Sequence, residues 1–251
     1  MTGMTLWRME WLRLVRTGRL WILVAVYALF GVLGPFSARY ISQIVERFGG
    51  GVEIVVPDPT PLDGMVQFYS NAGQIGLLAV VAVAAAAMTF DAQPQWAAFL
   101  RTRVPSVSRL LQPRVVMSSL GAVIALVVGT ALAAGLTGVL IGAVPVREVA
   151  LGTALGALYL AFAVSVTAVA ASVARQTVTT VLLTVGVLVV LPIAQVVAVI
   201  DPWLPSKLLG ATTALLGGQE LSELLTSAAV TVVTIPALLW LAARRLDARE
   251  A

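Results

Sequence analysis

The sequence contains no cysteine, no histidine and only one lysine. Without cysteine, disulfide bonds, thiolate nucleophiles and cysteine-based metal sites are excluded. Without histidine, Ser-His catalytic triads and zinc hydrolase sites of the HExxH kind are excluded. The one lysine, Lys207, lies in Pro-Ser-Lys-Leu, whereas a phosphate-binding P-loop needs Gly-Lys-Ser/Thr. We therefore expect no catalytic, cofactor-binding or metal site on this chain, and no ATP hydrolysis by it alone.

Charged residues are also scarce. They make up 11% of the 251 residues, against about 25% in a typical soluble domain. Hydrophobic residues make up 59%, and the mean hydropathy is +0.98. This composition predicts an integral membrane protein. The net charge of +4 does not indicate nucleic-acid binding, because basic residues clustered with stacking aromatics on a polar face are missing.

Six uncharged stretches approach or exceed the roughly 20 residues that cross a bilayer. They predict an all-α fold, with one transmembrane domain over residues 1–251 and spans at about 20–38, 69–90, 115–141, 149–172, 177–200 and 223–243. A further apolar stretch, at about 205–220, is interrupted by glycines and is too short to cross. It predicts a re-entrant or interfacial segment between the last two spans.

The basic residues are distributed unevenly between the predicted loops. With the N-terminus inside, twelve Arg lie inside, and three Arg and the Lys lie outside. Acidic residues show the opposite distribution, with eight of twelve outside. Because basic residues accumulate in cytoplasmic loops, both termini are predicted to be cytoplasmic. We expect a multi-pass protein of the cytoplasmic (inner or plasma) membrane.

The N-terminal residues 4–19 predict an amphipathic helix separate from the first span. At 100° per residue, Trp7 and Trp11 fall on one arc, and the opposite arc carries three arginines: Arg8, Arg13 and Arg16. Tryptophan prefers the headgroup level of a bilayer, and guanidinium groups face water and lipid phosphate. We expect this helix to lie in the membrane interface, as an anchor or as a partner-binding element.

Uncharged polar side chains mark a possible substrate path. Gln67, Asn71 and Gln74 fall at the outer part of the second span, and Gln195 falls near the end of the fifth. The predicted spans contain no charged residue at mid-depth. A proton- or sodium-coupled carrier generally needs one there, so the pattern argues against a secondary transporter.

The predicted cytoplasmic loop 91–114 carries the most specific sequence pattern. Phe90-Asp91 leaves the second span, the run from Phe99 to Arg109 follows, and Arg114 opens the third span. With six spans and an N-terminal amphipathic helix, this pattern resembles the ABC-2 type membrane (permease) subunits of bacterial ABC transporters. Members often show Phe/Ser-Glu, then a Leu-Leu-x-x-Pro-Val-Ser-Arg-like segment, then a basic residue. Here Asp91 replaces the usual Glu, and Trp96-Ala97 replaces the common Gly-Thr.

The resemblance implies an exporter permease that pairs with a second copy or a paralogue. Each subunit would dock a separate ATPase, which carries the ATP and magnesium, so this chain has no cofactor of its own. The loop would act as a coupling helix through Asp91, Trp96, Phe99, Leu100, Arg101, Pro105 and Arg109. Apolar spans suit a hydrophobic or amphipathic substrate, such as a lipid, a drug or a peptide.

Two alternatives stay open. The chain could be a non-transporting membrane scaffold or sensor that binds a cytoplasmic partner. It could also be a secondary transporter driven by an ion gradient. Dependence of ATP turnover on this chain separates the permease from both.

Overall fold

The computed structural model describes residues 3–48, 58–89, 108–174 and 176–248. Over these residues the chain is all-helical and contains no strand. Six helical stretches are long and apolar enough to cross a membrane, which confirms the predicted fold class in this respect. They are α2 (Arg19–Phe48), the continuous stretch from α3 (Pro61–Asn71) to α4 (Leu77–Met88), α6 (Ser108–Leu140), α7 (Val146–Val173), α8 (Thr177–Ala194) and α10 (Ser222–Ala248).

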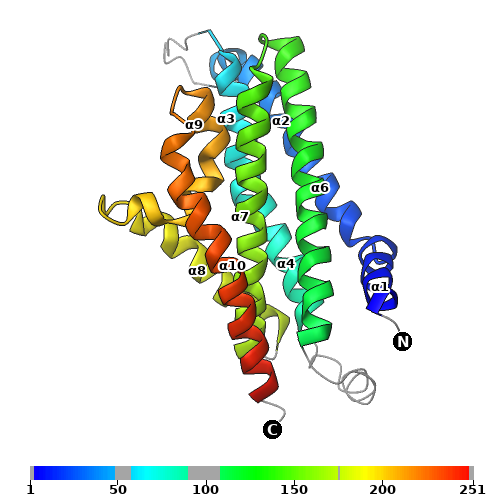
Figure 1. Cartoon of the computed structure of the whole chain (residues 1–251). Helices are drawn as coiled ribbons and strands as arrows, with labels where there is room; N and C mark the ends of the chain where they lie inside the picture. Colours follow the sequence, from blue (N-terminus) through cyan, green and yellow to red (C-terminus); the bar gives the residue numbers. More distant parts are fainter. Residues whose placement is uncertain (1–2, 49–57, 90–107, 175, 249–251) are drawn as a thin grey trace.

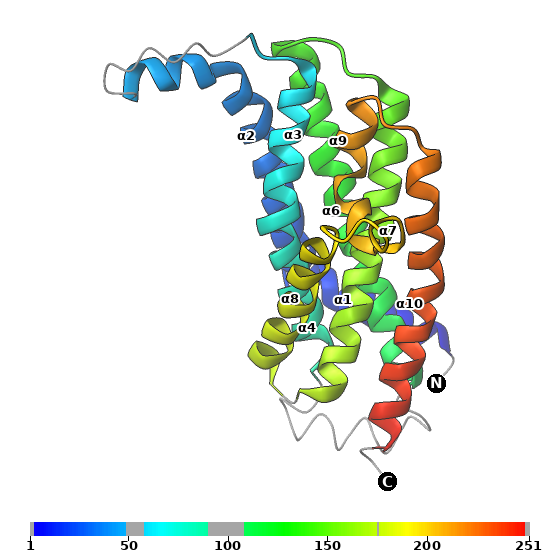
Figure 2. The same cartoon turned by 90° about the vertical axis from the view of Figure 1, so that its left-hand side faces the viewer.

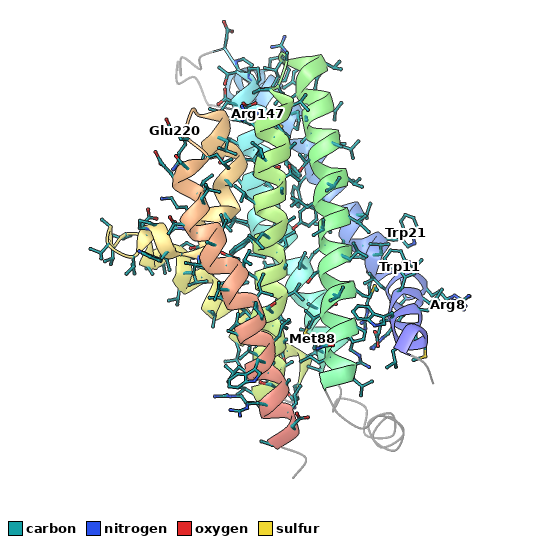
Figure 3. The ribbon with its side chains drawn as sticks, in the orientation of Figure 1. Arg8, Trp11, Trp21, Met88, Arg147 and Glu220 are labelled. Carbon is teal, nitrogen blue, oxygen red and sulfur yellow. The ribbon has the colours of Figure 1, made fainter. Side chains whose placement is uncertain are left out.

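The long helices form an elongated bundle with α7 at its centre (Figure 1). In α7, 67% of the most apolar stretch is buried, against 17% in α8 and in α10. Arg147 and Glu220 lie at one end of the bundle, the Arg147 end, and Met88 lies toward the other, the Met88 end (Figure 3). Helix α1 (Gly3–Arg16) lies on the outside of the bundle beside α6, toward the Met88 end, and is seen end-on in Figure 1 and from the side in Figure 2.

Two local features set the helix starts. Gly18 has a φ of +76°, a left-handed conformation that glycine adopts without strain, and it turns the chain between α1 and α2. At the start of α3, the Asp63 carboxylate accepts a hydrogen bond from the Thr60 N–H at 2.8 Å, and Pro61 occupies the first turn. The helix therefore begins at Pro61, eight residues before the predicted span 69–90, and Asp63 belongs to its first turn.

Helices α2 and α6 cross at close range through glycines. A Cβ atom on Gly31 would lie 2.5 Å from the Gly129 carbonyl oxygen, and one on Gly129 would lie 2.7 Å from the Tyr27 carbonyl oxygen. Backbones approach this closely only where side chains are absent. Around the crossing, the side chains of Tyr27, Met65 and Phe68 are fully buried. This contact is the tightest part of the core that α2 and α6 share with α3.

The predicted fifth span, 177–200, ends early, because α8 stops at Ala194. Pro192 lies in its last turn, where it removes one helical hydrogen bond and crowds the preceding turn. The chain then turns through residues 195–200 and forms two 3-10 helices, η3 (Asp201–Trp203) and η4 (Pro205–Gly210), before the short helix α9 (Ala211–Leu216).

Residues 205–216 pack against α7. Leu208 packs in one apolar cluster with Tyr159, near the middle of α7. Thr212 lies against Gly152, about two turns closer to the Arg147 end, so close that a Cβ on Gly152 would clash with it. The segment 205–220 thus contains η4 and α9, both packed against α7, and its re-entrant or interfacial placement stays a prediction.

Candidate functional site

An exposed polar stripe follows the helix α3 and the π-helical stretch η1 (Ala72–Gly76). Gln67, Ser70 and Gln74 are exposed, and their side chains have no hydrogen-bond partner in the described part of the chain. Asn71 is half-buried and donates its Nδ2–H to the Gln67 carbonyl oxygen at 2.7 Å. Gln67 and Asn71 thus lie on α3, and Gln74 lies on η1, which follows it directly.

The π-helical stretch is packed from two sides through its glycines. A Cβ on Gly76 would lie 2.8 Å from the Tyr27 ring, and one on Gly73 would lie 3.4 Å from the Leu209 side chain. π-helical turns are rare and are frequent at functional sites. The contact with Leu209 places η4 directly beside the polar stripe.

The segment 195–203 projects from the side of the bundle, partway along its length (Figures 1 and 2). Val196 is 85% exposed and Val199 is 81% exposed. In the described structure, the backbone N–H groups of Ala198 and Val199 have no hydrogen-bond partner. Lipid cannot satisfy such groups, and irregular backbone at membrane depth is tolerated only when protein covers it or water reaches it.

Three polar contacts hold this segment, two to the adjacent η4 and one to α10. The Gln195 side chain donates to Ser206 Oγ at 2.9 Å, so its amide N–H serves the local turn. Ser227 Oγ donates to the Pro202 carbonyl oxygen at 2.9 Å, and Lys207 Nζ pairs with Asp201 Oδ2 at 2.8 Å. We define the polar face as Gln67, Ser70, Asn71 and Gln74 together with residues 195–203. Figure 2 views the bundle from the side on which α3 and this segment lie.

The Asp201–Lys207 pair is a feature that the sequence did not reveal. The sequence predicts Asp201 in a loop after the fifth span and Lys207 in the re-entrant or interfacial segment 205–220. In the structure the pair lies alongside the bundle, because Pro202 is bonded to Ser227 of α10 and Leu208 packs against Tyr159. Both side chains keep partial exposure, 31% for Asp201 and 22% for Lys207.

A second polar cluster, at the Met88 end, joins three helices. Arg114 is 7% exposed; its Nε donates to Glu10 Oε1 of α1 at 2.9 Å, and its Nη1 donates to the Ala87 carbonyl oxygen of α4 at 2.8 Å. Arg13 lies 3.7 Å from Glu10 on the outer side of the pair. Arg114, predicted at the end of the loop 91–114, therefore lies inside α6. The signal for its partner was Glu10, the only acidic residue among the N-terminal arginines.

The predicted interfacial residues lie mostly on the outside of the bundle. Arg8 and Arg16 are exposed, Arg13 is half-buried, and Trp7 is 37% exposed. Trp11 and Trp21 lie on the same side at a similar level, and Arg8 points away from the bundle (Figure 3). Leu14 faces inward and is buried against α6, close to Gly121.

The predicted coupling residues cannot be compared with the structure in the same way. Asp91, Trp96, Phe99, Leu100, Arg101 and Pro105 lie outside the described residues. Arg109 lies in the first turn of α6, and its side chain is also outside the description.

No group of three or more acidic, cysteine or histidine residues that could hold a metal occurs within the described ranges. The sequence matches no family model, and neither a curated protein nor a solved structure matches the chain. The functional conclusion therefore depends on the chain's own residues and contacts.

Proposed function

We propose that this chain is the permease subunit of an ATP-driven ABC exporter of the ABC-2 type. It moves a hydrophobic or amphipathic substrate (a lipid, a drug or a peptide) out across the cytoplasmic membrane. The observation that carries the proposal is the polar face. Its unpaired amides and backbone N–H groups are costly against lipid, so this side of the bundle needs a protein neighbour or a water-filled path.

A second permease subunit meets that need. Packed against the polar face, it covers residues 195–203, and Gln67 and Gln74 then border the path between the two subunits. The amides supply hydrogen-bonding groups for the polar part of an amphipathic substrate, and the valines and Trp203 supply apolar contact. Such a division suits a substrate with a headgroup and an apolar body better than a highly charged polymer.

The distribution of charge supports an orientation with both termini in the cytoplasm. Described basic residues gather in α1 and in the last turns of α10, toward the Met88 end, whereas acidic residues gather at the Arg147 end, at Asp58, Asp63, Glu148, Glu220 and Glu223. Positive charge accumulates on the cytoplasmic side. We assign the Met88 end to that side and α1 to its interface, where Trp11 and Trp21 reach the headgroups.

The energy source is a separate ATPase, since the chain has no P-loop. It binds the loop 91–114, where the apolar residues Phe99 and Leu100 are followed by four arginines. ATP binding favours one arrangement of the paired permeases, and hydrolysis releases it. The loop transmits this preference because it connects α4 directly to α6.

Affinity purification from the native membrane in mild detergent tests the proposal. A near-stoichiometric partner with a P-loop is expected, and Phe99→Asp or Leu100→Asp should remove it while membrane insertion is unchanged. Thr102→Asp is the matched control, because it adds the same charge to the same segment without removing an apolar side chain. Retention of the ATPase by both Asp variants would refute the docking assignment. A partner without a P-loop would favour the scaffold.

A further inference from the structure

The Glu10–Arg114 pair is nearly inaccessible. Arg114 is 7% exposed, and the Glu10 side chain is 15% exposed. A guanidinium taken out of water is stable only when charged and polar partners replace its hydration. Glu10 supplies the opposite charge, and the Ala87 carbonyl supplies a second acceptor. Arg114 of α6 therefore links α1, through Glu10, to α4, through Ala87.

The pair lies close to both ends of the loop that the proposed function assigns to the ATPase. Ala87 is two residues before Thr89, where the described part of α4 ends, and Arg114 is less than two turns into α6. The end of α4 at the Met88 end of the bundle is also bonded to α8, since the Oγ1 atom of Thr89, directly after α4, lies 2.8 Å from Thr177 Oγ1. A force that separates the ends of α4 and α6 must break the Arg114–Ala87 hydrogen bond or move α1.

We propose that Glu10 and Arg114 are positioning residues that make α1 move with the inner ends of α4 and α6. Helix α1 then acts as a lever along the membrane surface. Its position sets the distance between the end of α4 and the start of α6, which flank the loop 91–114. Arg8 and Arg16, on the exposed side of α1, hold the lever at the surface through lipid phosphate. The link to ATP turnover rests on the proposed function, whereas the docking of α1 does not.

The first test uses the chain alone in nanodiscs, with spin labels on cysteines at Met9 (α1) and Val127 (α6). Both positions are exposed, and the chain has no native cysteine to remove. The native pair should give one narrow distance distribution. Glu10→Gln and Arg114→Gln should broaden it, because loss of one partner from a buried pair raises the undocked population about a hundredfold or more. The double exchange Glu10→Arg with Arg114→Glu should narrow the distribution again in part, because it restores the ion pair but not the hydrogen bond to the Ala87 carbonyl.

Arg13→Gln is the matched control, because it removes an arginine of α1 that faces the same carboxylate from the more exposed side. It should leave the distribution narrow. If Glu10→Gln and Arg114→Gln also leave it narrow, packing of Leu14 alone holds α1 and the proposal fails. A double exchange that gives a distribution no narrower than those of the single variants would equally contradict a pairwise role.

The second test uses the complex with its ATPase and measures substrate moved per ATP hydrolysed. Folded Glu10→Gln should lower this ratio at least about fivefold, at the low end of coupling between sites. A purely structural role would lower the thermal midpoint and leave the ratio unchanged, and that result would overturn the lever. If no ATPase partner exists, the spin-label experiment still decides the docking of α1, so the two failures are distinguishable.

Discussion

The two sides of the bundle satisfy their polar groups in different ways. Inside α3, α6 and α7, the Tyr69 hydroxyl lies 3.0 Å from both Thr130 Oγ1 and Thr153 Oγ1, so a buried polar cluster is closed within the chain. On the polar face, the amides of Gln67 and Gln74 have no partner among the described residues. The same chain thus completes one set of polar groups and leaves the other open.

The difference indicates where the molecule is rigid and where it needs a neighbour. At the α2–α6 crossing, backbone touches backbone through Gly31 and Gly129, and no repacking is available without moving a helix. Along residues 195–203, exposed side chains and unpaired backbone contribute little to the fold of one subunit. We infer that the α2–α6 crossing is the rigid frame of the subunit, and that residues 195–203 are covered only when a second subunit packs against them.

The largest expected effect breaks the frame. Gly129→Leu places a side chain where even a Cβ would meet the Tyr27 carbonyl oxygen, so α2 must move away. We expect a loss of about 3 kcal/mol or more in the free energy of unfolding, seen as a lower thermal midpoint or as aggregation in detergent. Gly135→Leu, on the same helix with open space around its Cβ, should be tolerated. Equal loss in both variants would argue against the close crossing.

Pairing at the polar face is tested with single cysteines in this cysteine-free chain. Val199→Cys, at a position 81% exposed on the projecting segment, should form an efficient cross-link to a second permease subunit in native membranes. Val233→Cys, at a position 69% exposed on α10, should not, because that face meets lipid. The mass of the product distinguishes a second copy from a paralogue. Equal cross-linking at both positions would refute pairing at this face.

Replacing the open amides separates function from stability. The double variant Gln67→Leu with Gln74→Leu should leave the thermal midpoint nearly unchanged, because neither amide has a hydrogen-bond partner among the described residues. It should lower ATP-driven transport about tenfold, as expected if about 1.4 kcal/mol of polar contact with the substrate is lost. Transport at the native rate would show that the stripe faces lipid or structural protein.

The smallest effect is expected at the Asp201–Lys207 pair. Lys207→Gln should cost about 1 kcal/mol of stability, because both side chains stay partly exposed and water in the proposed path can solvate Asp201. Arg114→Gln, at the buried pair, should cost about 3–5 kcal/mol. Chemical unfolding of both variants in the same detergent measures the difference. Similar costs would contradict the contrast in burial between the two pairs.

Much of the fold could be predicted from the sequence, because each crossing needs a run of about 20 apolar residues that is easy to recognise. The ends of the helices could not. The run from Val196 to Ile200 is as apolar as a helix core, so composition extended the fifth span past Pro192, although the proline was the correct signal. At α3, the uncharged stretch begins only after Asp63, because in the sequence a charge that caps a helix looks the same as one in a loop.

The candidate site was predictable only where it is local. Gln67, Asn71 and Gln74 recur at helical spacing, so their grouping follows from the sequence. The bond between Gln195 and Ser206 depends on the break after α8. Glu10 and Arg114 are separated by 104 residues, and no local pattern connects them. Contacts of this kind depend on the packing of three helices, which hydropathy does not encode.

Reconstitution with the purified partner ATPase tests the central claim most directly. The rate of ATP hydrolysis and the movement of a fluorescent amphipathic lipid are measured together in sealed liposomes, with and without this chain. We predict that ATP turnover increases with the permease present and that the lipid moves in one direction only when ATP is hydrolysed. An ATPase rate that does not depend on this chain, or lipid movement driven by an ion gradient without ATP, would contradict the account.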